Sequence, residues 1–107
     1  MNKESENKVQ ELQLIEQNLY NLLMQKQTFQ SRLLESENAL KEVEETKKQC
    51  YKVIGNILVA MDKEKLKKDL INEKEIFSLR LKNIEKQENK LKEKAQEIQK
   101  EVLKDLK

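Results

Sequence analysis

The chain has 107 residues, of which 39% are charged and 4% are aromatic, with no tryptophan, no histidine and one cysteine. This composition offers little apolar material for a compact globular core, whereas abundant Glu, Lys, Leu and Gln with no proline and one glycine are typical of long helices. The net charge of +2 comes from 22 basic and 20 acidic residues that are interspersed, so the basic stripe expected of a nucleic-acid-binding protein is missing.

Residues 1–49 are predicted to form the first helix. Their apolar residues recur in steps of three, four or seven, which is the spacing of a coiled-coil seam. The seam residues are Val9, Leu12, Ile15, Leu19, Leu22, Phe29, Leu33, Leu40 and Val43. One face of this helix therefore requires a partner helix.

Residues 50–61, CYKVIGNILVAM, carry a single charge among Val, Ile, Leu and Tyr. The pair Gly55-Asn56 separates two β-rich runs, and both residues tolerate positive φ, so the segment is predicted to be a β-hairpin. Both faces of this hairpin are apolar. We expect one face to carry Tyr51, Val53, Ile57 and Val59, and the other to carry Ile54, Leu58 and Ala60. Because an isolated hairpin is marginal in water and exposes two edges, its strands are expected to add to strands of other subunits.

Residues 62–107 are predicted to form the second helix. Asp62 can accept hydrogen bonds from the free N–H groups of the first turn, so it is the expected N-cap, with the acidic Glu64 close behind. The apolar series again runs in threes, fours and sevens. It comprises Leu66, Leu70, Phe77, Leu81, Ile84, Leu91, Ala95, Ile98 and Val102.

The two helical segments have similar lengths, which favours pairing within one chain as an antiparallel coiled coil. If facing residues have numbers that sum to about 110 or 111, apolar residues meet along most of the seam. The pairs are Leu40 with Leu70, Leu33 with Phe77, Phe29 with Leu81, Leu19 with Leu91, Ile15 with Ala95, Leu12 with Ile98, and Val9 with Val102. Near Lys26 and Glu88 the register is interrupted, and these long side chains are expected to lift their charges out of the seam. The alternative, one continuous helix in a parallel dimer, does not explain the hairpin segment.

The order of a long helix, a short hairpin and a long returning helix resembles that of the prefoldin subunits. The stretches YKVIGNILVAMDKEKLKKDL, LRLKNIEKQENKL and LLMQKQTFQSRLLESENALKEVE are similar to parts of the archaeal-type prefoldin beta subunit. The likeness covers nearly the whole chain as a single prefoldin-like domain, 1–107. One hairpin rather than two matches the beta class, because alpha-class subunits carry a second hairpin for which this chain has no room.

The resemblance implies an ATP-independent chaperone subunit in a hexamer of two alpha and four beta subunits. In that family the hairpins join in an inter-subunit β-barrel, and the coiled-coil tips hold unfolded client proteins and deliver them to a group II chaperonin. The oligomerisation role then falls on Tyr51, Val53, Ile54, Gly55, Ile57, Leu58 and Val59. The client-binding role falls on the segments 1–20 and 92–107, through Val9, Leu12, Leu14, Ile15, Ile98, Val102, Leu103 and Leu106. The charged stretch MNKESENK at the start departs from the hydrophobic tip expected of the family.

Other functions find little support in the residues. With no histidine and only Cys50, the chain is not expected to be an enzyme, to bind a metal or cofactor, or to form an internal disulfide. No apolar run is long enough for a membrane span and the first residues do not resemble a signal peptide, so we expect a cytoplasmic protein without membrane or nucleic-acid partners. The alternative function is a structural scaffold or tether that dimerises through its hairpin.

Overall fold

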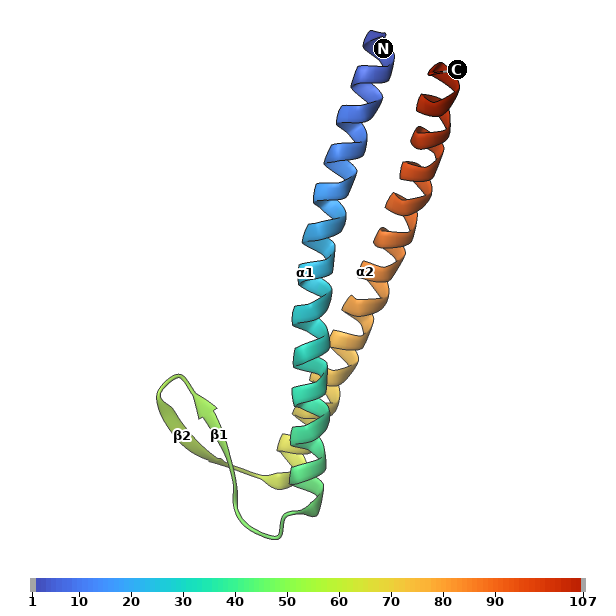
Figure 1. Cartoon of the computed structure of the whole chain (residues 1–107). Coiled ribbons are helices and arrows are strands. Elements are labelled where there is room, and N and C mark those ends of the chain that lie inside the picture. Colours follow the sequence, from blue (N-terminus) through green and yellow to red (C-terminus); the bar gives the residue numbers. More distant parts are fainter. Residues whose placement is uncertain (1, 107) are drawn as a thin grey trace. The chain divides into compact units, whose positions relative to one another are not determined.

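The computed structural model describes residues 2–106. Within them the chain forms helix α1 (Lys3–Glu45), strands β1 (Cys50–Ile54) and β2 (Ile57–Met61), and helix α2 (Lys63–Asp105), in that order (Figure 1). The predicted fold class, two long helices joined by a short β-hairpin, is confirmed. The chain divides into two compact units. Residues 2–27 and 81–106 form what we call the terminal unit, and residues 28–80 form the hairpin unit.

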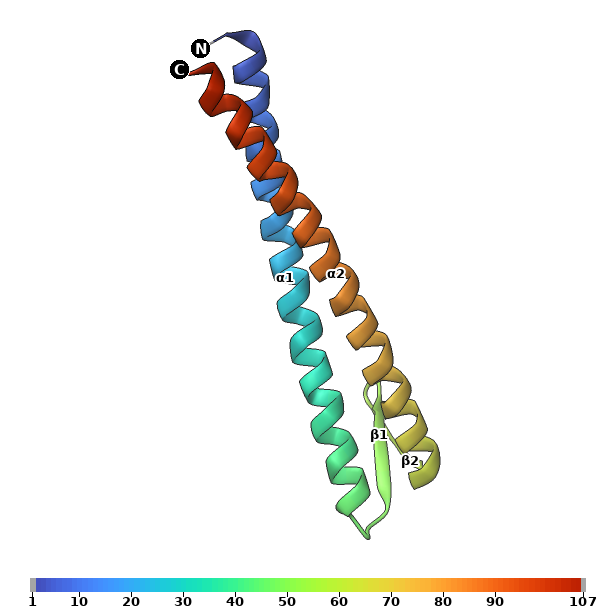
Figure 2. The ribbon, with the colours of Figure 1, turned by 90° about the vertical axis from the view of Figure 1, so that its right-hand side faces the viewer.

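In the terminal unit the first part of α1 and the last part of α2 lie side by side and run in opposite directions (Figures 1 and 2). Its apolar core contains Ile15, Leu22, Ile84 and Ile98, each with less than a tenth of its surface exposed. The other predicted seam residues of this unit are half-buried; they are Val9, Leu12, Leu19, Leu81, Leu91, Ala95 and Val102. The predicted seam is therefore confirmed for this unit.

One partly buried ion pair interrupts the apolar seam of the terminal unit. The Nζ atom of Lys26 lies 3.2 Å from Oε1 of Glu88, and the Glu88 side chain is only 10% exposed. The expectation that both long side chains lift their charges out of the seam is therefore wrong for Glu88. The carboxylate stays inside because the lysine crosses the seam and neutralises it, which removes much of the cost of burying a charge.

The Lys26–Glu88 pair gives a stability prediction. Replacing Lys26 by methionine leaves the buried carboxylate without its partner, and should lower the free energy of unfolding by about 2 kcal/mol. The double variant Lys26→Met with Glu88→Leu should recover most of this loss, because two apolar residues can fill the seam. Urea unfolding followed by far-UV circular dichroism, at equal chain concentration, measures the difference.

The control for this prediction breaks an exposed ion pair of the same unit. Lys94 lies 3.2 Å from Glu11, and both side chains are largely in solvent. Lys94→Met should change the unfolding free energy by less than about 1 kcal/mol, because exposed pairs contribute little. A Lys26→Met chain as stable as the unmodified one would show that burial of Glu88 costs nothing.

In the hairpin unit a small apolar cluster joins the base of the β-hairpin to both helices. Val43, Cys50 and Leu66 are buried in it, and Met61 and Leu70 pack against it. Further along the seam the rings of Phe29 and Phe77 lie 6.1 Å apart, and Arg80 stacks 5.5 Å above the Phe29 ring. The remaining seam residues predicted for this unit, Leu33 and Leu40, are half-buried. Between them the hydroxyl of Ser36 donates to the carboxylate of Glu73 across 3.4 Å.

The junction between α1 and the hairpin differs from the predicted boundary. Helix α1 ends at Glu45 rather than at residue 49, and its last turn contains no basic residue. The Nζ atom of Lys63 donates to the carbonyl oxygen of Thr46 at 2.8 Å, which places a cation at the negative end of the helix dipole. The side-chain amide of Gln49 donates to the carbonyl oxygens of Cys50 and Met61, both at 3.0 Å. These bonds satisfy backbone groups where the chain leaves one element for another.

Helix α2 begins directly after Asp62, which therefore occupies the predicted N-cap position. The carbonyl oxygen of Asp62 accepts the first hydrogen bond of the helix from Leu66 N–H at 2.9 Å. Glu64 lies in the first turn, where a negative charge interacts favourably with the helix dipole. The predicted start of this helix is thus off by a single residue.

The two strands pair antiparallel, with Cys50 opposite Met61 and Ile54 opposite Ile57. Gly55 adopts a φ of 60°, whereas Asn56 does not have a positive φ, so only the first turn residue needs the freedom of glycine. The predicted hairpin is confirmed, but the predicted faces are wrong. Paired residues share a face, so Ile57 and Val59 lie with Ile54 and Lys52, while Tyr51 and Val53 lie with Leu58 and Ala60. Because the turn consists of two residues, Gly55 and Asn56, odd-numbered residues of β1 pair with even-numbered residues of β2. The prediction had placed odd-numbered residues of both strands on the same face.

Candidate functional site

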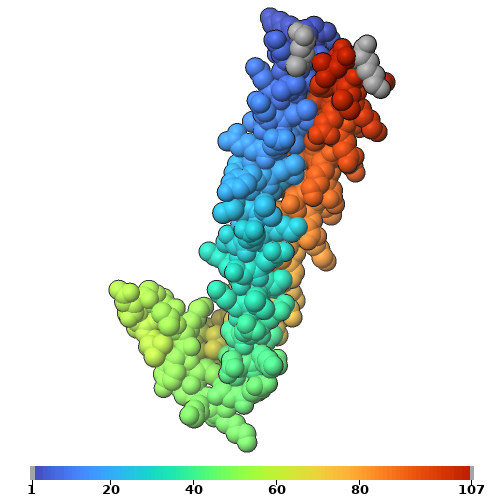
Figure 3. Space-filling model, viewed as in Figure 1, coloured from blue at the N-terminus to red at the C-terminus, as the bar shows by residue number. Residues whose placement is uncertain are grey.

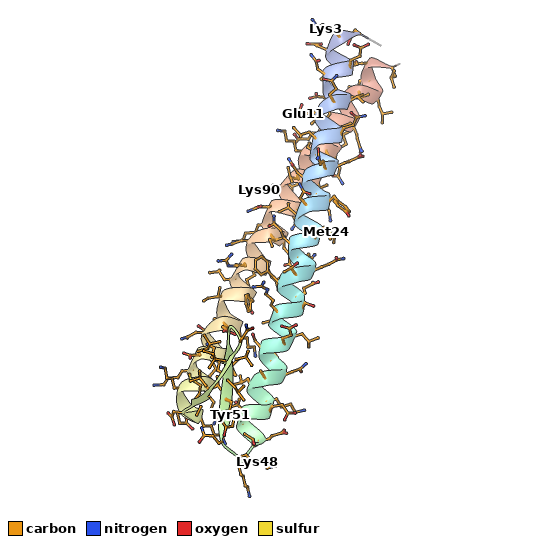
Figure 4. The ribbon with its side chains drawn as sticks, turned by 90° about the vertical axis from the view of Figure 1, so that its left-hand side faces the viewer. Lys3, Glu11, Met24, Lys48, Tyr51 and Lys90 are labelled. Carbon is orange, nitrogen blue, oxygen red and sulfur yellow. The ribbon has the colours of Figure 1, made fainter. Side chains whose placement is uncertain are left out.

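The hairpin exposes most of its large apolar side chains. Val53, Leu58 and Ile57 are each more than 60% exposed, and Tyr51 and Ile54 are each 54% exposed. Only its base is packed, because Cys50 and Met61 lie against Val43 and Leu66. Figure 3 shows the strands projecting from the helices of the hairpin unit, and Figure 4 labels Tyr51 on β1 and Lys48 in the preceding junction. Apolar side chains in such numbers on one short element are characteristic of an interaction surface.

The backbone of the hairpin also has unused bonding capacity. Within residues 2–106 the sheet contains only β1 and β2, so each strand has one edge without a strand partner. Unpaired strand edges readily accept further strands, and an apolar edge of this kind usually requires cover. All seven predicted oligomerisation residues belong to this element. Val59 is the exception in exposure, since it is half-buried, and Gly55 contributes the turn conformation rather than a side chain.

The eight predicted client-binding residues all lie in the terminal unit, and they differ in exposure. Ile15 and Ile98 are buried in the core. Val9, Leu12 and Val102 are half-buried in the seam. Leu14, Leu103 and Leu106 are exposed, at 57%, 59% and 60%. Only these last three offer an accessible apolar surface while the helices remain paired; Met1 and Lys107, which the predicted segments include, lie outside the described residues.

Leu103 on α2 and Leu106, the residue after its end, form an apolar pair. The N–H of Leu106 donates to the carbonyl oxygen of Val102 at 3.1 Å, which continues the helical turn, so residues three apart lie on the same side. On α1 the corresponding first turns carry no exposed large apolar side chain, since Lys3, Glu4, Glu6 and Asn7 are polar and exposed. This agrees with the charged character of the first residues in the sequence. The exposed apolar surface beside the chain termini therefore comes from α2.

A polar cluster joins the two helices beside these leucines. The hydroxyl of Ser5 donates to Oδ2 of Asp105 at 2.9 Å, and Ser5 is only 1% exposed. The amine of Lys8 lies 3.2 Å from Glu101 and 3.7 Å from Asp105. The hydrogen bond to Glu101 and the charges of both carboxylates raise the pKa of Lys8 above its ordinary value. We call these four residues, Ser5, Lys8, Glu101 and Asp105, the terminal clamp; the sequence analysis did not identify it.

A second surface that the sequence analysis missed is a shallow groove on the side of the terminal unit. It has a volume of about 390 Å³ and is mainly apolar. Its lining consists of Glu16, Leu19, Tyr20, Leu23, Glu88 and Lys92. Tyr20 and Leu23 are apolar residues that do not belong to the seam series. Their presence outside the seam could have indicated an additional apolar surface.

Among residues 2–106 no group of three or more His, Cys, Asp or Glu side chains is arranged to hold a metal ion. Neither α1 nor α2 contains a stretch of sufficient length and hydrophobicity to cross a membrane.

Comparison with known proteins identifies the family. The family model for prefoldin subunits matches residues 6–107, almost the whole chain. The chain belongs to the prefoldin family. Its relatives include prefoldin subunit beta of Archaeoglobus fulgidus, 34% identical over 91% of this chain and 85% of the relative. Prefoldin subunit beta of Sulfurisphaera tokodaii is 38% identical over 85% of this chain and 74% of the relative.

The fold agrees with a solved prefoldin structure. The crystal structure of the prefoldin beta subunit from Thermococcus strain KS-1 superimposes with a TM-score of 0.91, at 30% identity, over 99% of this chain and 95% of that chain. The resemblance to the beta class of prefoldin is therefore confirmed. Prefoldin subunits are chaperone subunits that form hetero-oligomers with one another, and this chain is one of them.

Proposed function

We propose that this prefoldin subunit holds unfolded proteins through the apolar residues of its terminal unit and delivers them to a group II chaperonin without using ATP. Four copies join two alpha-class subunits through their hairpins in this assembly, which acts in the cytoplasm. The observation that carries the proposal is that exposed large apolar side chains gather on the hairpin and also occur, as Leu103 and Leu106, beside the chain termini. One surface serves assembly and the other serves client binding.

The hairpin supports assembly because it combines apolar faces with open strand edges. Tyr51, Val53 and Leu58 share one face, and none of them is covered by the chain's own helices. Each such side chain contributes about 1.5–3 kcal/mol when it is fully buried, so several subunits that cover one another's hairpins gain a large free energy. Pairing of the open strand edges adds backbone hydrogen bonds and fixes the orientation of each subunit.

The exposed leucines beside the C-terminal end of α2 support client binding of low sequence specificity. Leu103 and Leu106 offer a small apolar surface flanked by charged residues such as Lys104 and Glu101. One such surface binds an apolar segment weakly. Several copies in one oligomer act together, and the effective concentration of the second and third contacts raises the overall affinity for an extended chain. A folded protein, with few exposed apolar segments, gains little from this arrangement.

The test is to purify the oligomer that this chain forms with an alpha-class prefoldin subunit and to measure both native mass and client holding. A mass of about six subunits is expected under the two-alpha, four-beta arrangement. The oligomer should suppress aggregation of a chemically unfolded protein without nucleotide, and should release it for refolding when a group II chaperonin and ATP are added. The isolated alpha-class subunit serves as the control.

Two results would contradict the proposal. A homodimer without affinity for unfolded proteins would favour the alternative, a scaffold that dimerises through its hairpin. An oligomer that holds clients but retains them in the presence of the chaperonin would separate holding from delivery, and only the delivery step would be withdrawn.

A further inference from the structure

We propose that the terminal clamp, formed by Ser5, Lys8, Glu101 and Asp105, is an autoinhibitory contact that keeps the paired ends of α1 and α2 closed and so limits how much apolar surface the terminal unit presents to a client. This inference rests on the proposed client-binding function. In this proposal, the four polar residues determine how often the neighbouring apolar seam residues become accessible to a client.

The clamp joins the helices at the position where their pairing is otherwise weakest. Helix ends open at low cost because their last turns lack some of the hydrogen bonds and neighbours of the interior. Here the first turn of α1 is fixed twice. Asn2 Oδ1 accepts from Ser5 N–H at 2.8 Å, and the Ser5 hydroxyl in turn donates to Asp105 on α2. Ser5 is only 1% exposed and the Asp105 side chain is 34% exposed, so the hydrogen bond between them is partly shielded from solvent.

The charged half of the clamp reinforces this bond. Lys8 lies between Glu101 and Asp105, which are four residues apart on α2 and therefore on the same side of that helix. Asp105 takes part in both halves, because it accepts from Ser5 and faces Lys8. The raised pKa of Lys8 agrees with an amine held near two carboxylates. Loss of Asp105 would weaken both links between the helices.

Opening of the clamp would uncover apolar residues that are covered in the closed unit. Val9 and Leu12 on α1, and Val102 on α2, are half-buried in the seam next to the clamp. Separation of the last turns would add these side chains to the exposed Leu103 and Leu106. The closed state then presents a small apolar surface, and the open state presents a larger one of the same kind. A clamp of moderate strength would allow binding while limiting association between the oligomers themselves.

The first test measures opening directly, by hydrogen exchange with mass spectrometry on the assembled oligomer. The variants are Ser5→Ala, Asp105→Asn and the two combined. Each single variant should raise amide exchange in residues 3–12 and 98–106 about three- to tenfold, because the hydrogen bond between Ser5 and Asp105 is lost or weakened. The double variant should exceed the larger single effect only slightly, because both changes break the same link. Amides of the hairpin unit, which the clamp does not touch, are the internal reference.

Lys94→Gln is the matched control, since it breaks the exposed Lys94–Glu11 pair of the same unit at an equal N–O distance. It should leave exchange near the termini unchanged. The proposal fails if the clamp variants exchange as slowly as the unmodified chain. It also fails if exchange rises equally in the hairpin unit, because the effect would then not be local to the clamp.

The second test asks whether closure limits client binding. Asp105→Asn should hold an unfolded client more tightly than the unmodified chain, by at most the roughly three- to tenfold rise in opening, because the closed state already binds through Leu103 and Leu106. The pair of changes Ser5→Cys and Asp105→Cys, oxidised to a disulfide verified by mass, should hold clients more weakly, and reduction should restore binding. If the variants open but bind clients no better, the clamp is only structural. If the unmodified oligomer binds no client at all, the proposed function fails while the exchange result still stands.

Discussion

Replacing Val53 by aspartate is expected to prevent assembly of the oligomer while both helices remain folded. Val53 is 69% exposed in the chain alone, so an aspartate at this position would stay hydrated and cost the isolated subunit little. In the proposed assembly the same side chain would lie between hairpins. An unpaired carboxylate buried there costs several kcal/mol, repeated in every copy of the subunit. The oligomer should therefore dissociate to chains and small species at micromolar concentration.

Native mass spectrometry of the Val53→Asp chain mixed with an alpha-class subunit measures this loss, and far-UV circular dichroism reports on the helices. The matched control is Lys48→Asp, a change to the same residue in the exposed junction just before β1, where Figure 4 shows the lysine extending away from the ribbon. The control should assemble normally. A Val53→Asp oligomer of full mass would exclude the hairpin face from the interface.

Val59→Asp should also block assembly, but Val59 is half-buried and this change would disturb the chain itself.

The coiled-coil part of the fold was predictable because its signal is repeated many times along the chain. Each apolar residue of the two series proved to be buried or half-buried. An antiparallel helical hairpin requires only this periodicity, a turn signal and two segments of similar length. The turn was equally clear, since Gly55 takes the positive φ that its position between two β-rich runs indicated.

The polar positions of the seam were predictable in principle but were not recognised. Each step of seven in the apolar series passes over one seam position. On α1 these positions hold Lys26 and Ser36, and on α2 they hold Glu73 and Glu88. The structure pairs Lys26 with Glu88 and Ser36 with Glu73. Polar pairs of this kind within a coiled-coil seam favour one register over its neighbours, because any shift leaves a polar group facing an apolar one.

The terminal clamp follows the same rule at the ends of the series. A step of four before Val9 leads to Ser5, and a step of three after Val102 leads to Asp105. Periodicity therefore places both residues in the seam, although it does not reveal the lysine that joins them. What the sequence could not supply was the arrangement at the junction. The bonds from Lys63 and Gln49 depend on where α1 stops and how the strands leave it, and no local pattern encodes either.

The surface that binds clients is predicted to depend most on the exposed Leu103 and Leu106. Replacing Leu103 and Leu106 together by serine should weaken holding of an unfolded protein at least about tenfold, because each copy loses two apolar contacts and the losses multiply across the copies of an oligomer. Assembly should be unaffected, since both residues lie in the terminal unit and the hairpin is unchanged. Helix stability should change little, because both side chains are already about 60% exposed.

The matched control is Leu79→Ser, which removes a leucine from the same helix with the same 60% exposure but from the hairpin unit. Suppression of aggregation by oligomers of equal mass, measured over a range of oligomer concentrations, gives the relative affinities. If the proposal is correct, only the Leu103 and Leu106 variant shifts the curve to higher concentration. A comparable shift for Leu79→Ser would mean that exposed leucines outside the terminal unit contribute as well, and no shift for either variant would assign client binding to other surfaces. The groove beside Leu19 and Tyr20 would then be the next candidate, because it is a mainly apolar hollow of the terminal unit that the paired helices leave open.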